Sequence, residues 1–279
     1  MAAPSSKRVN IVVFGEIGSG KSSLVNLIVG SNVAETSSDA GSCTLDARYY
    51  DAIVQNRSFR IYDTVGLNEP EFLAHPDSLV SAINKGYRLV KSLADEGGIS
   101  LLLFCVRRGR ITTNMQNNYK IFQDFFCQKK VPVALVVTHC DGDGADEWWE
   151  MNHEDFAYFG IHAVAHACIT ANPKFASLYP ISRQKVCDLL LRHSSGEGFT
   201  MEKATWIAEL IRNILVMVGI KPRIDSLKAR SQKLRECGLA DSEIEMVLKR
   251  ISSLDRDLDT LRRFRRSRPA LFAILNLAH

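Results

Sequence analysis

Short apolar runs alternate with longer amphipathic stretches along most of the chain. The apolar runs predict strands at Val9–Phe14, Arg48–Val54, Ser58–Tyr62, Ile99–Val106, Val133–Thr138 and His162–Ile169. The amphipathic stretches predict helices at Leu24–Val29, Ser78–Leu93, Asn114–Cys127, Ser182–Leu191 and Met201–Val218. This alternation is typical of an α/β fold, in which a mostly parallel sheet carries helices on both faces. The short Gln55-Asn56-Arg57 link between the second and third strands predicts one antiparallel hairpin in that sheet.

The pattern changes after Lys221-Pro222, where the chain becomes helical, charged and poor in aromatic residues. We therefore predict a first domain over residues 7–220 and an α-helical extension over residues 221–279. Within the extension, apolar residues occupy the a and d positions of a heptad pattern at Ile244, Val247, Ile251, Leu254, Leu258 and Leu261. Two arrangements stay open, an intramolecular helical hairpin and a coiled coil with another chain.

A glycine-rich run joins the first predicted strand to the first predicted helix. It reads Gly15-Glu16-Ile17-Gly18-Ser19-Gly20-Lys21-Ser22, and the predicted binding set extends to Ser23. At this spacing the backbone N–H groups point at the β- and γ-phosphates of a nucleotide, Lys21 neutralises their charge, and the Ser22 hydroxyl ligates Mg²⁺. The dipole of the following helix favours the same anion. The run predicts a phosphate-binding loop for a nucleoside triphosphate.

Two segments further along the chain match the switch elements of such a site. Asp63-Thr64-Val65-Gly66 follows a predicted strand, so Asp63 is expected to hold Mg²⁺ through water and the Gly66 N–H to reach the γ-phosphate. Thr44 lies in the polar stretch of residues 31–46, which predicts a loop that closes on triphosphate and Mg²⁺. Ser42 is the alternative to Thr44, and an ordinary loop threonine is the other interpretation.

The fifth predicted strand ends in Thr138-His139-Cys140-Asp141, where a base-reading element is expected. A carboxylate can accept hydrogen bonds from N1 and the exocyclic amine of guanine, whereas adenine offers no such donor pair, so Asp141 predicts GTP or GDP. His139 would stack on the base. If Asp141 instead caps the following helix, an ATP site stays open. A second base-contacting segment is expected within Ala167–Thr170.

These residues resemble the immunity-associated GTPases, which form one group with septins and the chloroplast outer-envelope translocon receptors. The resemblance covers about Lys7–Val218, and its most discriminating piece is Gly109-Arg110-Ile111-Thr112. His139 replaces the usual lysine of the base motif, and Asp63–Asn68 resembles little-characterised fungal members. The resemblance implies a GTP-binding G domain that dimerises across its nucleotide face.

Hydrolysis needs an aligned water and positive charge near the γ-phosphate. Leu67 follows Gly66 and cannot orient water through its side chain, so we expect slow hydrolysis by a monomer. Together with Lys21, Thr44 and Gly66, Arg110 completes the predicted catalytic set, acting across a dimer as an arginine finger. A solvated basic loop is the alternative for Arg110. Two functions stay open: a GTPase stimulated by self-association, and a non-hydrolysing scaffold held together by GTP.

Composition limits the remaining possibilities. The chain has 279 residues, 46% of them hydrophobic and 24% charged, which is typical of a globular protein, and its net charge of +4 gives no sign of nucleic-acid binding. Seven scattered cysteines and the absence of a signal peptide predict reduced thiols and a cytoplasmic location. The polybasic Arg262–Arg268 precedes an apolar stretch, Pro269–Leu277, which predicts either peripheral membrane contact or docking on the first domain.

Overall fold

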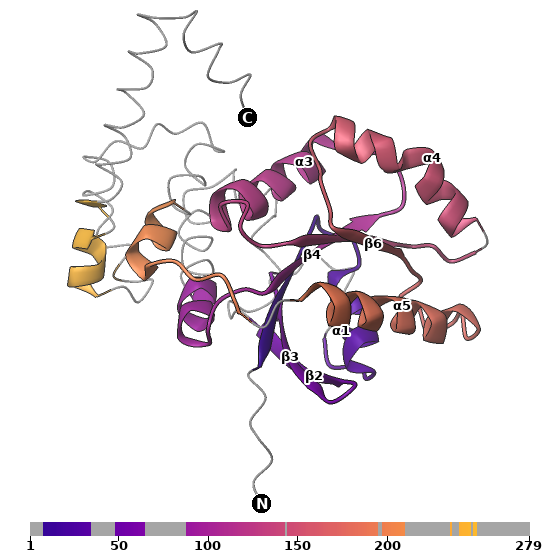
Figure 1. Ribbon diagram of the computed structural model, residues 1–279, viewed down its shortest axis with the longest axis horizontal. Helices are drawn as coiled ribbons and strands as arrows, with labels where there is room; N and C mark the ends of the chain where they lie inside the picture. Colours follow the sequence, from indigo (N-terminus) through magenta and orange to yellow (C-terminus); the bar gives the residue numbers. More distant parts are fainter. Residues whose placement is uncertain are drawn as a thin grey trace, which may run out of the picture. The chain divides into compact units, whose positions relative to one another are not determined.

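The computed structural model describes residues 8–34, 48–64, 88–142, 144–194, 197–209, 235, 240–246 and 248–249 (Figure 1). Chain contacts divide the protein into two compact units, Met1–Lys203 and Ala204–His279. The predicted boundary after residue 220 lies outside the described residues. The sites predicted at Thr44 and Gly66 and the tail after residue 261 also lie outside them.

The first unit is built on a sheet whose six strands, among the described residues, run in the order β2-β3-β1-β4-β5-β6. The strands are β1 (Val9–Phe14), β2 (Arg48–Val54), β3 (Arg57–Asp63), β4 (Leu101–Arg107), β5 (Val133–Thr138) and β6 (Ala165–Cys168). β2 is antiparallel to β3, and every other neighbouring pair is parallel. The predicted α/β class and the antiparallel hairpin are therefore confirmed.

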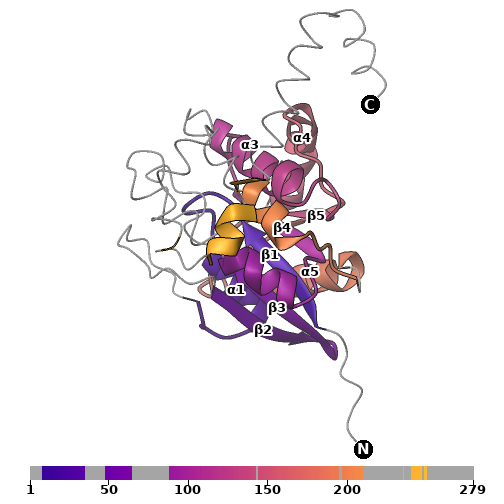
Figure 2. The same cartoon turned by 90° about the vertical axis from the view of Figure 1, so that its left-hand side faces the viewer.

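Helices cover both faces of this sheet, and their described bounds are α1 (Lys21–Val29), α3 (Thr113–Lys120), the π-helix η2 (Ile121–Phe126), α4 (Ala145–Tyr158) and α5 (Leu178–His193). α1 and α5 lie on one face, and α3 and α4 lie on the other (Figures 1 and 2). Beneath α1 and α5, alternate strand residues such as Ile11, Leu103 and Val136 form one buried core cluster. The intervening residues face the other side, where Phe14 stacks on Phe104 with 4.7 Å between the ring centroids.

Two helices differ from their predictions. The helix predicted at Asn114–Cys127 is α-helical only through Lys120 and then widens into a π-helix, in which the Cys127 N–H bonds to the Phe122 carbonyl at 2.9 Å. The widening places Phe122 on Phe14, with 4.5 Å between the ring centroids. No helix was predicted at α4, because its apolar stripe is weak and Phe156 is the one side chain the helix buries fully.

The second unit is described in part. Its described residues include a helical stretch over residues 203–209, which begins at the end of the first unit, and another over residues 241–246. Trp206 and Ile207 are buried. In the described part of the chain, no helix combines the length and the hydropathy that a membrane span requires. Five cysteines in the described part are reduced: Cys105, Cys127, Cys140, Cys168 and Cys187.

Candidate functional site

The glycine-rich run forms the turn between β1 and α1, and its backbone leaves no room for a side chain at Gly15. Gly15 has a φ of 147°, and a Cβ built there would lie 2.1 Å from the Cys105 carbonyl oxygen. Gly20 precedes α1 with a φ of 91°, next to the Thr138 side chain. The loop is also held from below, because the Ser19 carbonyl accepts hydrogen bonds from Cys105 Sγ at 3.1 Å and Thr138 Oγ1 at 2.7 Å. β4 and β5 thus fix the loop on the sheet.

Lys21 brings a positive charge into the middle of this loop. Its side chain is buried, and Nζ donates to the carbonyl oxygens of Gly15 at 2.8 Å and Glu16 at 2.9 Å. In the described structure no side chain caps the N-terminus of α1, the helix that begins at Lys21. An ammonium beside a helix N-terminus is an arrangement suited to phosphate.

Two oxygen side chains meet beside Lys21. Ser22 Oγ donates to Asp63 Oδ2 at 3.3 Å, and Asp63 is 5% exposed at the end of β3. A hydroxyl and a carboxylate are hard oxygen ligands of the kind Mg²⁺ takes, and Mg²⁺ usually keeps several waters, so two protein groups suffice. These residues therefore fit the predicted magnesium site. Of the predicted metal ligands, the structure brings Ser22 and Asp63 together.

The Gly109–Thr112 box contacts the phosphate loop through its last residue. Thr112 caps α3 by accepting a hydrogen bond from the Met115 N–H at 2.9 Å, and its Oγ1 donates to Glu16 Oε1 at 2.6 Å. Arg110 is exposed two residues earlier. Arg108 instead turns toward α4, where it donates to the Gly144 carbonyl at 3.3 Å and lies 6.0 Å from the Trp148 ring centroid. The box thus positions an exposed arginine near the loop without pairing it within the described residues.

The end of β5 carries a bulge that sets the direction of His139. The Ile169 N–H bonds to the Val137 carbonyl at 2.8 Å, but the Ile169 carbonyl accepts from the Cys140 N–H at 3.1 Å, one residue later than a regular parallel ladder requires. The extra residue is His139, whose φ is 59°. Its Nδ1 lies 2.9 Å from Thr138 Oγ1. Because that hydroxyl donates its one proton to Ser19, it accepts a hydrogen bond from Nδ1.

His139 is suited to stacking. Burial and the nearby Arg107 lower the pKa of its imidazole, and Asp141 opposes them. The ring is therefore neutral at pH 7, in the state that stacks best on a flat base.

Asp141 is oriented by a residue from the next strand. Thr170 is buried after the end of β6, and its Oγ1 donates to Asp141 Oδ1 at 2.5 Å. Thr170 is itself held, because its N–H donates to Ser182 Oγ at 3.0 Å. A carboxylate with one oxygen engaged in this way keeps a fixed direction and a free acceptor edge.

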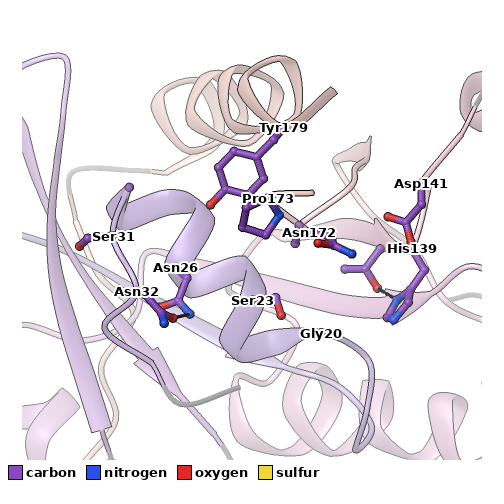
Figure 3. A pocket seen from close by; sticks show the side chains of 13 residues that line it. Gly20, Ser23, Asn26, Ser31, Asn32, His139, Asp141, Asn172, Pro173 and Tyr179 are labelled. Atoms are coloured by element: carbon purple, nitrogen blue, oxygen red, sulfur yellow. Dashed lines mark hydrogen bonds between the residues drawn. The ribbon is translucent and has the colours of Figure 1, made fainter. Parts of the chain in front are cut away.

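These groups surround a cavity of about 590 Å³ beside α1 (Figure 3). A volume of this size falls within the usual range for small-molecule sites. His139 and Asp141 lie on one side of it and Ser23 and Gly20 on the other (Figure 3). The lining residues are Gly20, Ser23, Asn26, Gly30, Ser31, Asn32, Thr138, His139, Asp141, Ala171, Asn172, Pro173 and Tyr179.

Sequence reasoning missed part of this lining. The second base-contacting segment was predicted at Ala167–Thr170, yet the wall of the cavity is made by the next three residues, 171–173. Asn26 was missed as well. It is buried in α1, and its Oδ1 accepts from the N–H groups of Val33 at 2.9 Å and Ala34 at 2.7 Å, which holds the loop after the helix. An amide side chain within the otherwise apolar stretch Leu24–Val29 of α1 was the signal that could have identified Asn26.

Part of the chain is similar to known GTPases. Residues 10–139 match the family described as 50S ribosome-binding GTPase. Immune-associated nucleotide-binding protein 10 of Arabidopsis thaliana is 29% identical over 139 residues, which cover 50% of this chain and 28% of the relative. GTPase Der of Campylobacter jejuni is 27% identical over 210 residues, which cover 70% of this chain and 41% of the relative.

The region that matches contains the phosphate loop, Asp63 and the box. This part of the chain is similar to P-loop GTPase domains. A crystal structure of Era from Aquifex aeolicus bound to GDP·AlF4− superposes with a TM-score of 0.50 at 21% identity, over 70% of this chain and 60% of that chain, and it supports the fold. Because the chain spans less than half the length of the two curated relatives, the activity and partners of the whole protein are a matter for proposal.

Proposed function

We propose that the GTPase domain binds GTP and GDP with Mg²⁺ and hydrolyses GTP to GDP and phosphate, slowly as a monomer and faster as a dimer. One observation carries the nucleotide assignment: Lys21, the Ser22–Asp63 pair and the cavity beside Asp141 all gather around the first turn of α1. A triphosphate at the loop and a guanine in the cavity would be joined by the ribose near Gly20 and Ser23.

Guanine selectivity rests on Asp141. One of its oxygens is engaged by Thr170, so the carboxylate has a set orientation for the N1 and exocyclic N–H groups of guanine. His139 would lie against the face of the base as a neutral ring. Adenine presents no matching pair of donors and would leave the carboxylate unpaired, at a cost of about 1–3 kcal/mol.

Ser22 and Asp63 would hold Mg²⁺, which when bound neutralises charge on the phosphate oxygens. Thr44 and Gly66 are proposed to complete this side of the site. Titrating the purified chain with a fluorescent GTP analogue, with Mg²⁺ and with EDTA, tests the proposal. We expect EDTA to weaken GTP binding more than GDP binding, because the γ-phosphate adds charge and a metal-binding oxygen. Equal affinities with and without Mg²⁺ would contradict it.

Arg110 is proposed to act in the partner's site of a dimer formed across the nucleotide face. Two observations support this role: its side chain is exposed, and Thr112, two residues on, bonds to Glu16 of the phosphate loop. GTP turnover is measured against protein concentration, with the mass recorded by light scattering on the same samples. The turnover rate per molecule should rise as dimers form, and Arg110→Ala should abolish the rise. Lys120→Ala, which removes an exposed cation at the end of α3, is the matched control.

A scaffold without hydrolysis is the second candidate, and Leu67 favours it. A leucine in the position after Gly66 has no group that could orient the attacking water. In that case GTP would hold a dimer or polymer together, and no phosphate would be released at any protein concentration.

The location of the protein, the fold of its extension and its wider kinship are also proposals. We propose a cytoplasmic location with peripheral membrane contact through the basic and apolar tail, and a hairpin or coiled coil in the extension. The kinship with septins and with fungal members of the group stays a prediction. Sedimentation with anionic and neutral vesicles tests the tail, because a polybasic segment binds only the anionic ones and releases them in high salt.

A further inference from the structure

Two cysteines lie against each other behind the cavity of the GTPase domain. Cys140 stands between His139 and Asp141, and Cys168 is the last residue of β6, two residues before Thr170. Their side chains are 3% and 4% exposed, and each thiol shifts the pKa of the other. Cys140 Sγ also lies 3.6 Å from the Val137 carbonyl oxygen, to which it donates. Each cysteine therefore precedes one of the two groups that build the acidic side of the cavity.

The contact follows from the backbone. β5 and β6 are paired in parallel, with Val137 opposite Cys168. The bulge at His139 lets the Cys140 N–H bond to the Ile169 carbonyl at 3.1 Å, so the chain after β5 stays against the chain after β6. Main-chain hydrogen bonds thus hold the backbones of the two cysteine segments side by side.

We propose that Cys140 and Cys168 are an oxidation site, which a hydroperoxide converts into an intrachain disulfide, and that this bond weakens binding of the guanine base. The consequence for the base rests on the proposed function, whereas the disulfide does not.

The two thiols have different roles in the reaction. Hydrogen bonding from Cys168, with help from Arg108, lowers the pKa of Cys140, and the same contact raises the pKa of Cys168. The Cys140 thiolate attacks the peroxide, an S–O bond forms as the O–O bond breaks, and the departing hydroxide takes a proton to become water. Cys168 then attacks the sulfenic sulfur, an S–S bond forms, and a second water leaves with the remaining oxygen. Two thiols and one hydrogen peroxide give one disulfide and two waters.

A disulfide would move the base side of the site. Its S–S bond of about 2.05 Å is much shorter than any non-bonded contact between two sulfur atoms, so Cys140 must shift toward β6. Asp141 is the next residue and would lose its alignment with Thr170 and with the base. Loss of one hydrogen bond to a charged group corresponds to about tenfold in affinity.

The proposal is tested on the full reduced chain with hydrogen peroxide. Peptide mapping by mass spectrometry should find the Cys140 and Cys168 peptides joined, with the loss of two hydrogens, and fluorescent GDP should bind about tenfold more weakly until dithiothreitol restores it. Cys140→Ser and Cys168→Ser should each remove the peroxide effect. Cys187→Ser, in the buried face of α5, is the matched control and should respond like the unmodified chain.

Two results would overturn the inference: both thiols staying reduced under peroxide, or a mapped disulfide that leaves GDP affinity unchanged. Nucleotide binding by the reduced chain distinguishes these two results from a failure of the proposed base site. If the reduced chain binds guanine no better than adenine nucleotides, the assignment of Asp141 fails, while peptide mapping still decides whether the disulfide forms.

Discussion

The two sides of the proposed nucleotide site are built in different ways. The proposed phosphate side is the unbroken run Gly15–Ser22, which offers mainly backbone groups and one lysine. The base side combines side chains from separate segments, His139 and Asp141 after β5 and Thr170 after β6. A loop built from one continuous segment leaves a recognisable motif in the sequence. A group of side chains that strand order brings together from separate segments does not.

The phosphate side should be the more sensitive to a single methyl group. Gly15→Ala places a Cβ 2.1 Å from the Cys105 carbonyl oxygen, so the loop must leave the sheet. We expect a loss of about 4 kcal/mol in unfolding free energy, together with loss of GTP binding. Gly18→Ala is the control: it also has a positive φ, of 73°, but open space around it, and should cost about 1 kcal/mol. Denaturant unfolding measures both, and equal effects would contradict the packing argument.

On the base side, the largest effect is expected at Asp141. Asp141→Asn replaces one of the two carboxylate acceptors with an amide donor and removes the charge, so guanine loses one hydrogen bond and the charge on the other, while xanthine, with a carbonyl in place of the amine, gains a partner. GTP affinity should fall about a hundredfold, which corresponds to about 3 kcal/mol. Competition binding with GTP, XTP and ATP measures the change. Unchanged selectivity would mean that Asp141 does not contact the base.

A smaller effect is expected at Thr170, which acts through Asp141. Thr170→Val keeps the shape but removes the donor to Asp141 Oδ1, so the carboxylate loses its fixed direction. We expect GTP affinity to fall about tenfold. Thr170→Ser keeps the hydroxyl and should restore binding, which a loss of packing alone would not allow. The selectivity for GTP over XTP, measured in the same titrations, should also fall.

The smallest effect is expected where the box meets the phosphate loop. Thr112→Val removes the cap of α3 and the hydrogen bond to Glu16, at a cost of about 1 kcal/mol in unfolding free energy. Because the Glu16 contact is exposed, GTP affinity should change by no more than about threefold. Thr112→Ser should behave like the unmodified chain in thermal unfolding. A larger loss of affinity would make the box part of the binding site.

Three predicted strands have the same bounds in the structure, Val9–Phe14, Arg48–Val54 and Val133–Thr138. They succeed because each is a short run rich in β-branched or aromatic residues, which favour strands. α4 was missed because a helix that buries Phe156 and stacks Trp149 on His166 of β6 has little periodicity to detect. The π-helix η2 was missed because the ring contact that accompanies it, Phe122 on Phe14, joins residues more than a hundred positions apart.

The sequence by itself determined the phosphate loop, the α/β class and the antiparallel hairpin, because each depends on residues that are neighbours in the chain. It also pointed to Asp141 as a candidate base reader. Only the tertiary structure decided what that carboxylate touches: the parallel pairing of β5 with β6 brings Thr170 to Asp141 and Cys168 to Cys140. Such contacts depend on which strands lie side by side, and no local pattern of residues encodes that order.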